Sequence, residues 1–336
     1  MSGRTEGGKP HPSPYIPGLN MIALIAKRIL TLLITLLAVS FLIYFVMGLL
    51  PGDPAAIMLG TSASPDTLAA LQKQMGLDQP LALRYLQWLV AMARGDLGQS
   101  YTYGVPVAGL ILDRLIVTLP LALIAVGLSI LMALPLGVLA ARYRGGAIDF
   151  LCGLFSHAGI AVPGFWVGLL LILLFSSTLG WMPAGGFPGW QAGAGAALKA
   201  LVLPAVALAI SQAGVLTRVC RSAMLEVMSE DFVRTVRAKG IGETATLWKH
   251  VLPNALIPVI TMIGLQFTFL IAGTVLVENV FNLPGLGRLA YQALTQRDIV
   301  VMQSVVLFFC ALVITMNFLV DMAYLLIDPR LRARAA

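Results

Sequence analysis

The sequence predicts an all-α polytopic membrane protein that crosses the bilayer about six times. Of its 336 residues, 59% are hydrophobic and 11% are charged, whereas about 25% of the residues of a soluble domain are charged. A soluble fold of this size could not bury so much apolar surface and still present a polar exterior. The composition therefore excludes a soluble enzyme, a nucleic-acid-binding domain and a disordered scaffold, and it makes the lipid bilayer the expected surroundings.

The spans are predicted from the runs that lack Asp, Glu, Lys and Arg, because a helix needs about 20 apolar residues to cross the hydrocarbon core. The longest run, residues 150–198, loses its apolar density after Trp181 and enters Met182-Pro-Ala-Gly-Gly-Phe-Pro-Gly189, which is typical of turns. We therefore expect one long helix there, followed by a loop. The expected spans are 29–50, 115–141, 150–180, 200–217, 253–278 and 299–327.

The distribution of Lys and Arg tests this count, since cytoplasmic loops carry an excess of both. Six spans place 15 of the 22 basic residues on one side of the membrane and seven on the other. Dividing residues 150–198 into two spans would move the six basic residues of 218–249 to the other side and remove the bias. We therefore expect six spans with both termini in the cytoplasm.

The first segment, residues 1–20, contains four prolines and four glycines without a periodic pattern. It is expected to be a disordered cytoplasmic tail, and residues 21–336 are expected to form the transmembrane domain. Met21 would itself make a natural start for such a protein. The first span is too long for a cleaved secretory signal and is interpreted as a retained signal anchor.

Residues 51–114 form a long predicted external loop that contains helices. Ser64-Pro65 resembles an N-cap followed by a proline, and Gly76 would stop that helix. A second helix is expected from Pro80 to Arg94. Both helices would lie on the membrane surface or cap the bundle, or they would form a docking surface for an external partner; the sequence alone leaves these alternatives open.

Signatures of enzyme chemistry are missing from the sequence. The only Gly-Lys pair, Gly8-Lys9, is followed by proline, so no phosphate-binding loop is present. The three histidines are scattered, and no HExxH or GxSxG motif occurs. The three cysteines lack CxxC spacing. We expect a chain that is not an enzyme, has no catalytic residue and holds no cofactor or metal.

Two carboxylates are predicted within or at the ends of spans. Glu278 lies at the outer end of the fifth span, and Asp321 lies in the last span about two turns before its cytoplasmic end. Intramembrane carboxylates are costly, so both are candidates for a translocation pathway. The alternatives are an interfacial residue in water or a helix-end contact for Glu278, and a structural hydrogen bond or ion pair for Asp321.

The predicted cytoplasmic loop 218–249 is the most informative segment, with six basic and four acidic residues. Two short helical patterns are separated by Gly240, which stands where the first helix would stop. A helix–glycine–helix elbow fits a groove in a partner protein. The alternative is a solvated basic loop that faces the lipid.

The elbow resembles a known signature. Arg234-Thr-Val-Arg-Ala-Lys-Gly240, nine residues and then His250-Val-Leu-Pro253 is similar to the EAA signature of ABC importer permeases, which is Glu-Ala-Ala, three residues, Gly, nine residues, Ile, one residue and Leu-Pro. Gly240, Leu252 and Pro253 match it. The sequence departs from it at the Glu-Ala-Ala positions, which hold Arg234, Thr235 and Val236, and at the Ile position, which holds His250. These departures resemble the dipeptide/oligopeptide/nickel branch of these permeases, where an Arg-Thr-Ala-Arg-Ala-Lys-Gly form is usual.

Further segments resemble that branch in order over about residues 21–332, and the long first external loop resembles its B-type permease. These segments are Leu49-Leu-Pro-Gly-Asp-Pro54, Gly76-Leu-Asp-Gln-Pro80, Arg94-Gly-Asp-Leu-Gly-Gln-Ser100, Thr118-Leu-Pro120, Phe281-Asn-Leu-Pro-Gly-Leu-Gly-Arg288, Arg297-Asp298 and Asp328-Pro-Arg330.

The resemblance implies an ABC type I importer permease-like bundle in the bacterial cytoplasmic (inner) membrane. It implies a second homologous permease, two ATPase subunits and an external, periplasmic solute-binding protein as partners, with ATP and Mg on the ATPase subunits. It assigns ATPase coupling to the loop 218–249 and to these residues: Arg234, Thr235, Val236, Arg237, Lys239, Gly240, Leu252 and Pro253.

The resemblance leaves the substrate open among short peptides, nickel chelates, glutathione, and opines or sugars. Two other classes remain as alternatives. A gradient-driven secondary transporter would need no ATPase, and an intramembrane hydrolase would need a paired catalytic constellation that the sequence does not show.

Overall fold

The computed structural model describes residues 17–49, 54–59, 64–74 and 76–327. Within these ranges the chain is helical, without a β-strand. The α-helices are α1 (Pro17–Gly48), α2 (Pro54–Leu59), α3 (Pro65–Gln74), α4 (Leu81–Ala93), α5 (Val107–Arg142), α6 (Ala147–Ala161), α7 (Gly164–Leu171), α8 (Ala194–Met228), α9 (Asp231–Ala238), α10 (Glu243–Ala245), α11 (Leu252–Val280), α12 (Leu286–Thr295) and α13 (Ile299–Ile327). Two π-helical turns, Ile172–Thr178 and Thr246–Val251, and a 3-10 turn, Trp190–Ala192, complete the elements.

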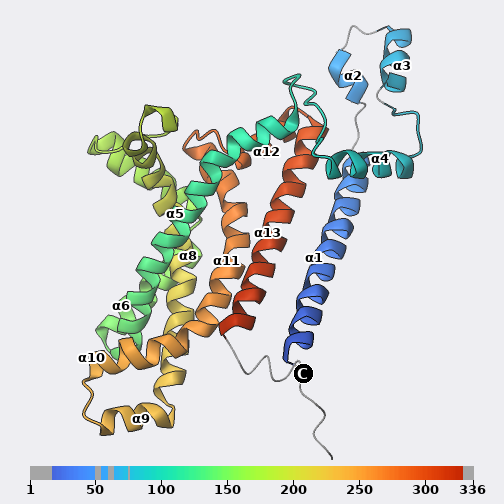
Figure 1. The fold of residues 1–336 in the computed structure, drawn as a ribbon. Coiled ribbons are helices and arrows are strands. Elements are labelled where there is room, and N and C mark those ends of the chain that lie inside the picture. The colour runs from blue at the N-terminus through green and yellow to red at the C-terminus, as the bar shows by residue number, and fades with distance from the viewer. Residues whose placement is uncertain (1–16, 50–53, 60–63, 75, 328–336) are drawn as a thin grey trace, which may run out of the picture.

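The long helices run side by side and form a bundle (Figure 1). Five segments of the described chain are long and apolar enough to cross a membrane, and the pair α6–α7 makes a sixth if it counts as one bent span. This confirms the predicted all-α polytopic architecture. The five segments are Ile25–Gly48, Val107–Arg142, Ala194–Met228, Glu243–Val280 and Ile299–Val320.

The single long helix expected over 150–180 is wrong, because the chain bends by 103° between α6 and α7. Val162 has extended backbone angles (φ −92°, ψ 124°). Pro163 has no N–H to donate and disfavours the helical conformation of the residue before it. The length of the apolar run indicates that the segment can lie in lipid, but it does not predict where the helix breaks. Pro163 determines that position.

The helices also extend beyond the predicted spans. α8 continues to Met228, into the segment assigned to a loop, because Cys220, Ala223 and Met224 are buried against the bundle. α1 begins at Pro17, so residues 17–20 are helical rather than disordered; proline is pre-organised for the first helical position. The rest of the expected tail, residues 1–16, lies outside the described residues.

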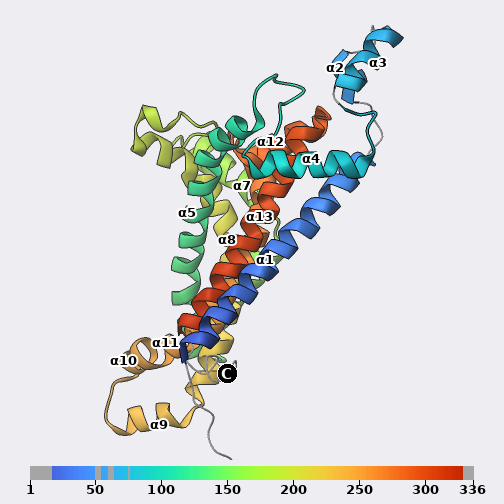
Figure 2. The same cartoon turned by 45° about the vertical axis from the view of Figure 1, so that its right-hand side comes forward.

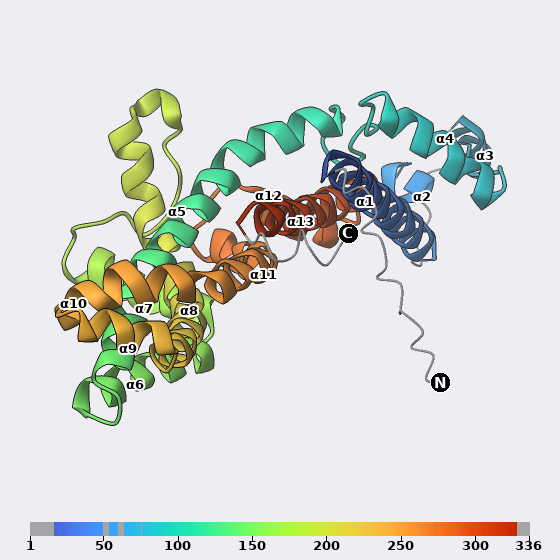
Figure 3. The same cartoon turned by 60° about the horizontal axis from the view of Figure 1, so that its bottom comes forward.

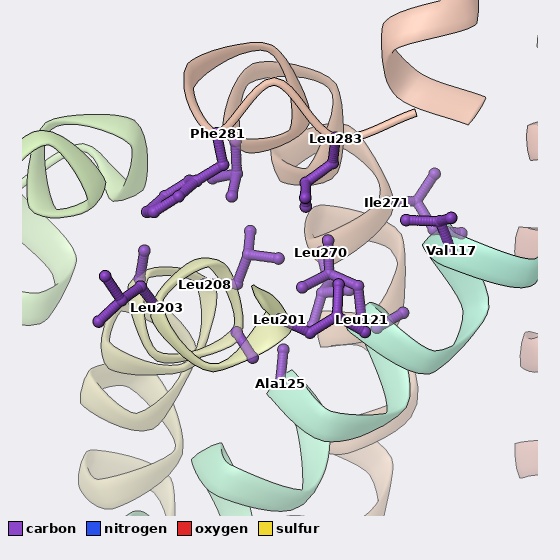
Figure 4. Close-up of a cluster of buried hydrophobic side chains, with 14 of the residues drawn as sticks. Val117, Leu121, Ala125, Leu201, Leu203, Leu208, Leu270, Ile271, Phe281 and Leu283 are labelled. Atoms are coloured by element: carbon purple, nitrogen blue, oxygen red, sulfur yellow. The ribbon is translucent and has the colours of Figure 1, made fainter. Parts of the chain in front are cut away.

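The core sits where α5, α8 and α11 pack together. Figure 4 shows side chains from these three helices converging on one another, with Phe281 and Leu283 closing the cluster from the turn after α11. α6 reaches α8 at a close approach of two glycines. A Cβ on Gly159 would lie 2.8 Å from the carbonyl oxygen of Ile210, so only glycine fits there.

α1 stands apart from this core and packs along α13, running obliquely across it (Figure 2). The two helices expected in the loop after α1 are formed as α3 and α4. α4 lies across the end of α1, where its buried Tyr85 shares a hydrogen bond of 3.0 Å with Ser40. α4 therefore caps the α1–α13 pair.

Candidate coupling site

Residues 229–253, named the coupling segment after their predicted role, project beyond one end of the bundle (Figure 1), and this end is turned toward the viewer in Figure 3. The segment leaves α8 at Ser229, forms α9, turns at Gly240 and returns through α10 and the π-helical turn into α11. Gly240 has φ +80°, a left-handed conformation that glycine adopts without steric cost. The predicted helix–glycine–helix elbow is therefore formed.

α9 packs against the bundle with one fully buried side chain. Val233 is fully buried in a cluster with Leu216, Cys220 and Met224, whereas its neighbours Phe232 and Arg234 are exposed. Asp231 lies in the first turn of α9, where the negative charge of its carboxylate interacts favourably with the positive end of the helix dipole. Within α9, Val233 is buried and Val236 is half-buried, and the other side chains face outward.

The returning arm is packed more deeply. Leu247 and Val251 lie in the same buried cluster as Val233. Thr246 is also fully buried, and its hydroxyl donates to the carbonyl oxygen of Gly242 at 3.1 Å. The π-helical turn ends directly before Leu252-Pro253, and such turns inside helices are frequent at functional sites. One apolar cluster therefore holds both arms of the elbow.

Polar contacts brace the elbow at its surface. The guanidinium of Arg237 pairs with Glu243 at 3.3 Å across the turn, and Arg234 pairs with Asp231 at 3.3 Å. Both pairs are solvent-exposed, so each adds little stability. At the end of α5, Arg142 donates to the hydroxyl of Thr244 at 3.2 Å, which links the elbow to a third long helix.

The predicted coupling residues do not share one environment. Leu252 is buried in the apolar cluster, so it serves the joint and offers no surface to a partner. Val236 is half-buried. The exposed members of the predicted set are Arg234, Thr235, Arg237, Lys239, Gly240 and Pro253.

Two exposed aromatic residues of the segment are absent from the predicted set. Phe232 is 39% exposed and Trp248 is 44% exposed. Exposed aromatic side chains frequently anchor protein–protein interfaces. The signal in the sequence was an aromatic residue within a charged stretch, which the signature itself does not contain.

Glu278 is not in water but fully buried at the opposite end of the bundle. Its carboxylate accepts a hydrogen bond from the hydroxyl of Thr118 at 2.6 Å and one from the backbone N–H of Arg288 at 3.0 Å. Thr118 in turn accepts from the N–H of Leu286 at 2.8 Å. Glu278 therefore makes a helix-end contact, and its part in a translocation pathway stays a prediction. Asp321 lies in α13, but its side chain is outside the described part of the chain.

A second buried acid, Asp298, was not predicted as a site residue although its motif was noted. Its carboxylate accepts from the hydroxyl of Ser100 at 2.5 Å and from the backbone N–H groups of Thr102 and Val301 at 3.1 and 3.2 Å. These contacts join the segment before α5 to the start of α13. Among the residues that the structure describes, no group of three or more His, Cys, Asp or Glu could hold a metal ion.

Comparisons with known proteins agree with this arrangement. The family model described as binding-protein-dependent transport system inner membrane component matches residues 133–333, and the model of the N-terminal part of such components matches residues 21–122. A Brucella abortus (strain 2308) protein, named for the permease of a peptide transport system, is 43% identical over 93% of this chain and 99% of its own length. The glutathione transport system permease protein GsiC of Salmonella paratyphi A is 40% identical over 93% and 99%.

The fold has a solved counterpart. A chain of the inward-facing MetNI methionine ABC transporter superposes with a TM-score of 0.55 at 19% identity, and the match covers 65% of this chain and 96% of that one. At this identity the likeness concerns the fold alone.

Proposed function

Since the chain belongs to the family of binding-protein-dependent transport system inner membrane components, we propose that it forms one half of the pore of an importer for di- or oligopeptides or related small solutes, beside a second, homologous permease. Family membership makes the chain a multi-pass permease subunit of an ABC importer in the inner membrane, which works with an ATPase and a substrate-binding protein. Family membership also favours ATP-driven import over gradient-driven transport. Both termini and the coupling segment would face the cytoplasm.

The relatives support the substrate class. One group of them is named for peptide transport and another for glutathione transport, and glutathione is itself a tripeptide. The part of this chain that the structure describes contains no metal-ligand cluster that would favour nickel. Peptides and peptide-like solutes are therefore the class to test first.

The geometry of the coupling segment supports a role in transmitting force. The observation that carries this proposal is the contrast on α9, where Val233 is locked into the core while Phe232 and Arg234 are exposed. A groove of the ATPase would take the exposed surface. ATP and Mg would be bound by the ATPase chain, since no phosphate-binding loop exists here.

Closure of the ATPase dimer would then carry α9 toward the membrane. Because α9 and the π-helical turn share one apolar cluster with α5, α8 and α11, the displacement would reach three long helices as a rigid-body movement. The bundle would exchange an inward-facing state for an outward-facing one, with ATP favouring the second through differential contacts.

The proposal is tested by purifying the tagged chain from native membranes in mild detergent, with mass spectrometry of its partners and an ATPase assay. We expect a second permease and one or two ATPases with phosphate-binding loops, and ATP hydrolysis that a binding protein with its peptide stimulates. A chain that purifies alone, is folded and takes up solute under an ion gradient without ATP would overturn it.

A further inference from the structure

A cavity of about 450 Å³ opens between the end of α5, the first half of α6 and the facing part of α8. It lies at the same end of the bundle as the coupling segment, since α5 there contacts Thr244 through Arg142. The cavity belongs neither to the coupling segment nor to the buried acids of the opposite end. Its lining combines the apolar Phe150 of α6 with polar and charged side chains of both α6 and α8, which are Asp149, Ser156, His157, Thr217, Arg218 and Arg221.

The polar part contains hydrogen-bonding capacity that the described chain does not use. The hydroxyl of Thr217 is buried and has no hydrogen-bond partner, which is costly unless a ligand or water supplies one. Beside it, the exposed Arg218 forms neither an ion pair nor a hydrogen bond with any residue that the structure describes. Arg221 is held by Asp149 through two hydrogen bonds of 2.6 and 2.7 Å.

The charges of this lining leave one positive charge unbalanced. Arg221 and Asp149 compensate each other, whereas Arg218 does not have a carboxylate within the described cavity lining. A phosphodiester carries one negative charge and accepts hydrogen bonds from guanidinium and hydroxyl groups. An anionic ligand would therefore pair with Arg218 and neutralise the cavity lining.

The apolar part of the lining indicates where the phosphate group comes from. Phe150 lines the cavity and is 71% exposed, and the adjoining Leu151 and Leu154 are 61% and 56% exposed. An apolar surface that begins at a basic cavity suits a ligand with a phosphate head and hydrocarbon chains. Basic pockets between helices at the cytoplasmic side of a membrane bind anionic lipid headgroups.

We propose that this cavity is a binding site for an anionic phospholipid, with the phosphate on Arg218 and the hydroxyl of Thr217 and the acyl chains along the exposed face of α6. Asp149 positions the guanidinium of Arg221 at the rim. The site requires the spanning bundle but not the coupling role of residues 229–253. Failure of the proposed import function would therefore leave it intact.

The test uses the intact transporter complex in nanodiscs of phosphatidylcholine, with phosphatidylglycerol added in steps and a photoactivatable phosphatidylglycerol as probe. We expect saturable cross-linking to peptides of α6 and α8. Arg218→Gln removes the unpaired charge, and Gly153→Leu fills the cavity without changing any charge, because Gly153 lines the cavity with open space around it. Each should weaken phosphatidylglycerol binding about tenfold.

Lys249→Gln is the matched control, since the exposed Lys249 lies at the same end of the bundle but does not line the cavity; its binding should equal that of the wild type. Thr217→Val keeps the shape and should lower the preference for phosphatidylglycerol without lowering the melting temperature. Thr217→Val and Gly153→Leu decide the matter if Arg218→Gln does not assemble. Unchanged binding in both variants, or an equal loss in the control, would overturn the proposal. Displacement of the probe by millimolar inorganic phosphate would also overturn it, because it would indicate a site for the free anion. So would the absence of cross-linking because the second permease, and not a lipid, covers the cavity.

Discussion

The carboxylate of Glu278, at the end of α11, accepts a hydrogen bond from the backbone N–H of Arg288 in the first turn of α12 at 3.0 Å. The first N–H groups of a helix have no partner within the helix, and an acceptor there also meets the positive end of the helix dipole. A Cβ on Gly285 would collide with the carboxylate, so any larger residue there would have to displace it from these hydrogen bonds. Glu278 therefore stabilises the turn between α11 and α12, and the hydrogen bonds of Thr118 connect α5 to the same turn.

Substitution of Glu278 tests this stabilising role. Glu278→Ala would leave the hydroxyl of Thr118 and the N–H of Arg288 buried without an acceptor, and we expect a loss of about 2–4 kcal/mol in stability. Glu278→Gln retains one acceptor and should lose less. The melting temperature of the purified complex measures both, with uptake measured in parallel. A normal melting temperature with abolished uptake would instead make Glu278 a residue of the translocation pathway.

A matched pair of threonines separates the Glu278 network from burial in general. Thr118→Val removes the donor to Glu278 and the acceptor for Leu286 together, whereas Thr274→Val removes a buried hydroxyl that bonds only within its own helix. We expect the first to cost about 1–3 kcal/mol more than the second. Thr118→Val should add little to Glu278→Ala, since residues of one network are not additive.

Gly240 tests the elbow. A side chain at φ +80° is strained by about 1–2 kcal/mol, and a large one would also occupy the surface offered to the ATPase. We expect Gly240→Trp to leave membrane insertion intact while it uncouples or detaches the ATPase. Gly95→Trp is the control, since Gly95 has φ +85° and is likewise surrounded by open space. Normal peptide-stimulated ATP hydrolysis and uptake in Gly240→Trp would contradict the coupling role.

Adjacent residues of α9 should fail in different ways. Val233→Ala removes part of the buried anchor. We expect it to lower the free energy of unfolding by about 1–3 kcal/mol, which a lower melting temperature would reveal. Phe232→Ala removes an exposed ring, so the melting temperature should hold while the affinity for the ATPase falls at least about tenfold. Co-purification of the ATPase at increasing detergent wash measures the second effect. Equal retention of the ATPase in Phe232→Ala and the wild type would exclude Phe232 as an anchor.

The sequence allowed prediction of what depends on local chemistry. α13 begins at Ile299, where an apolar run begins, and the turn at Gly240 follows from the residue that adopts positive φ without steric cost. The bend at Pro163 was missed because hydropathy averages over the residue that breaks the helix. The burial of Glu278 was missed for a different reason, since Thr118 is 160 residues away in the chain. Partners at such separations leave no periodic signal.

Asp298 provides the sharpest test of a contact that only the fold reveals. Its buried carboxylate holds the hydroxyl of Ser100 and the N–H groups of Thr102 and Val301, so it fixes the segment before α5 to the start of α13. Asp298→Ala orphans all three donors, and we expect a stability loss of about 2–4 kcal/mol together with faster proteolysis between residues 97 and 106. Asp96→Ala, which removes one exposed acceptor of the same segment, should cost less than about 1 kcal/mol. Equal melting temperatures and equal cleavage rates for the two variants would show that the segment is held by its apolar contacts instead.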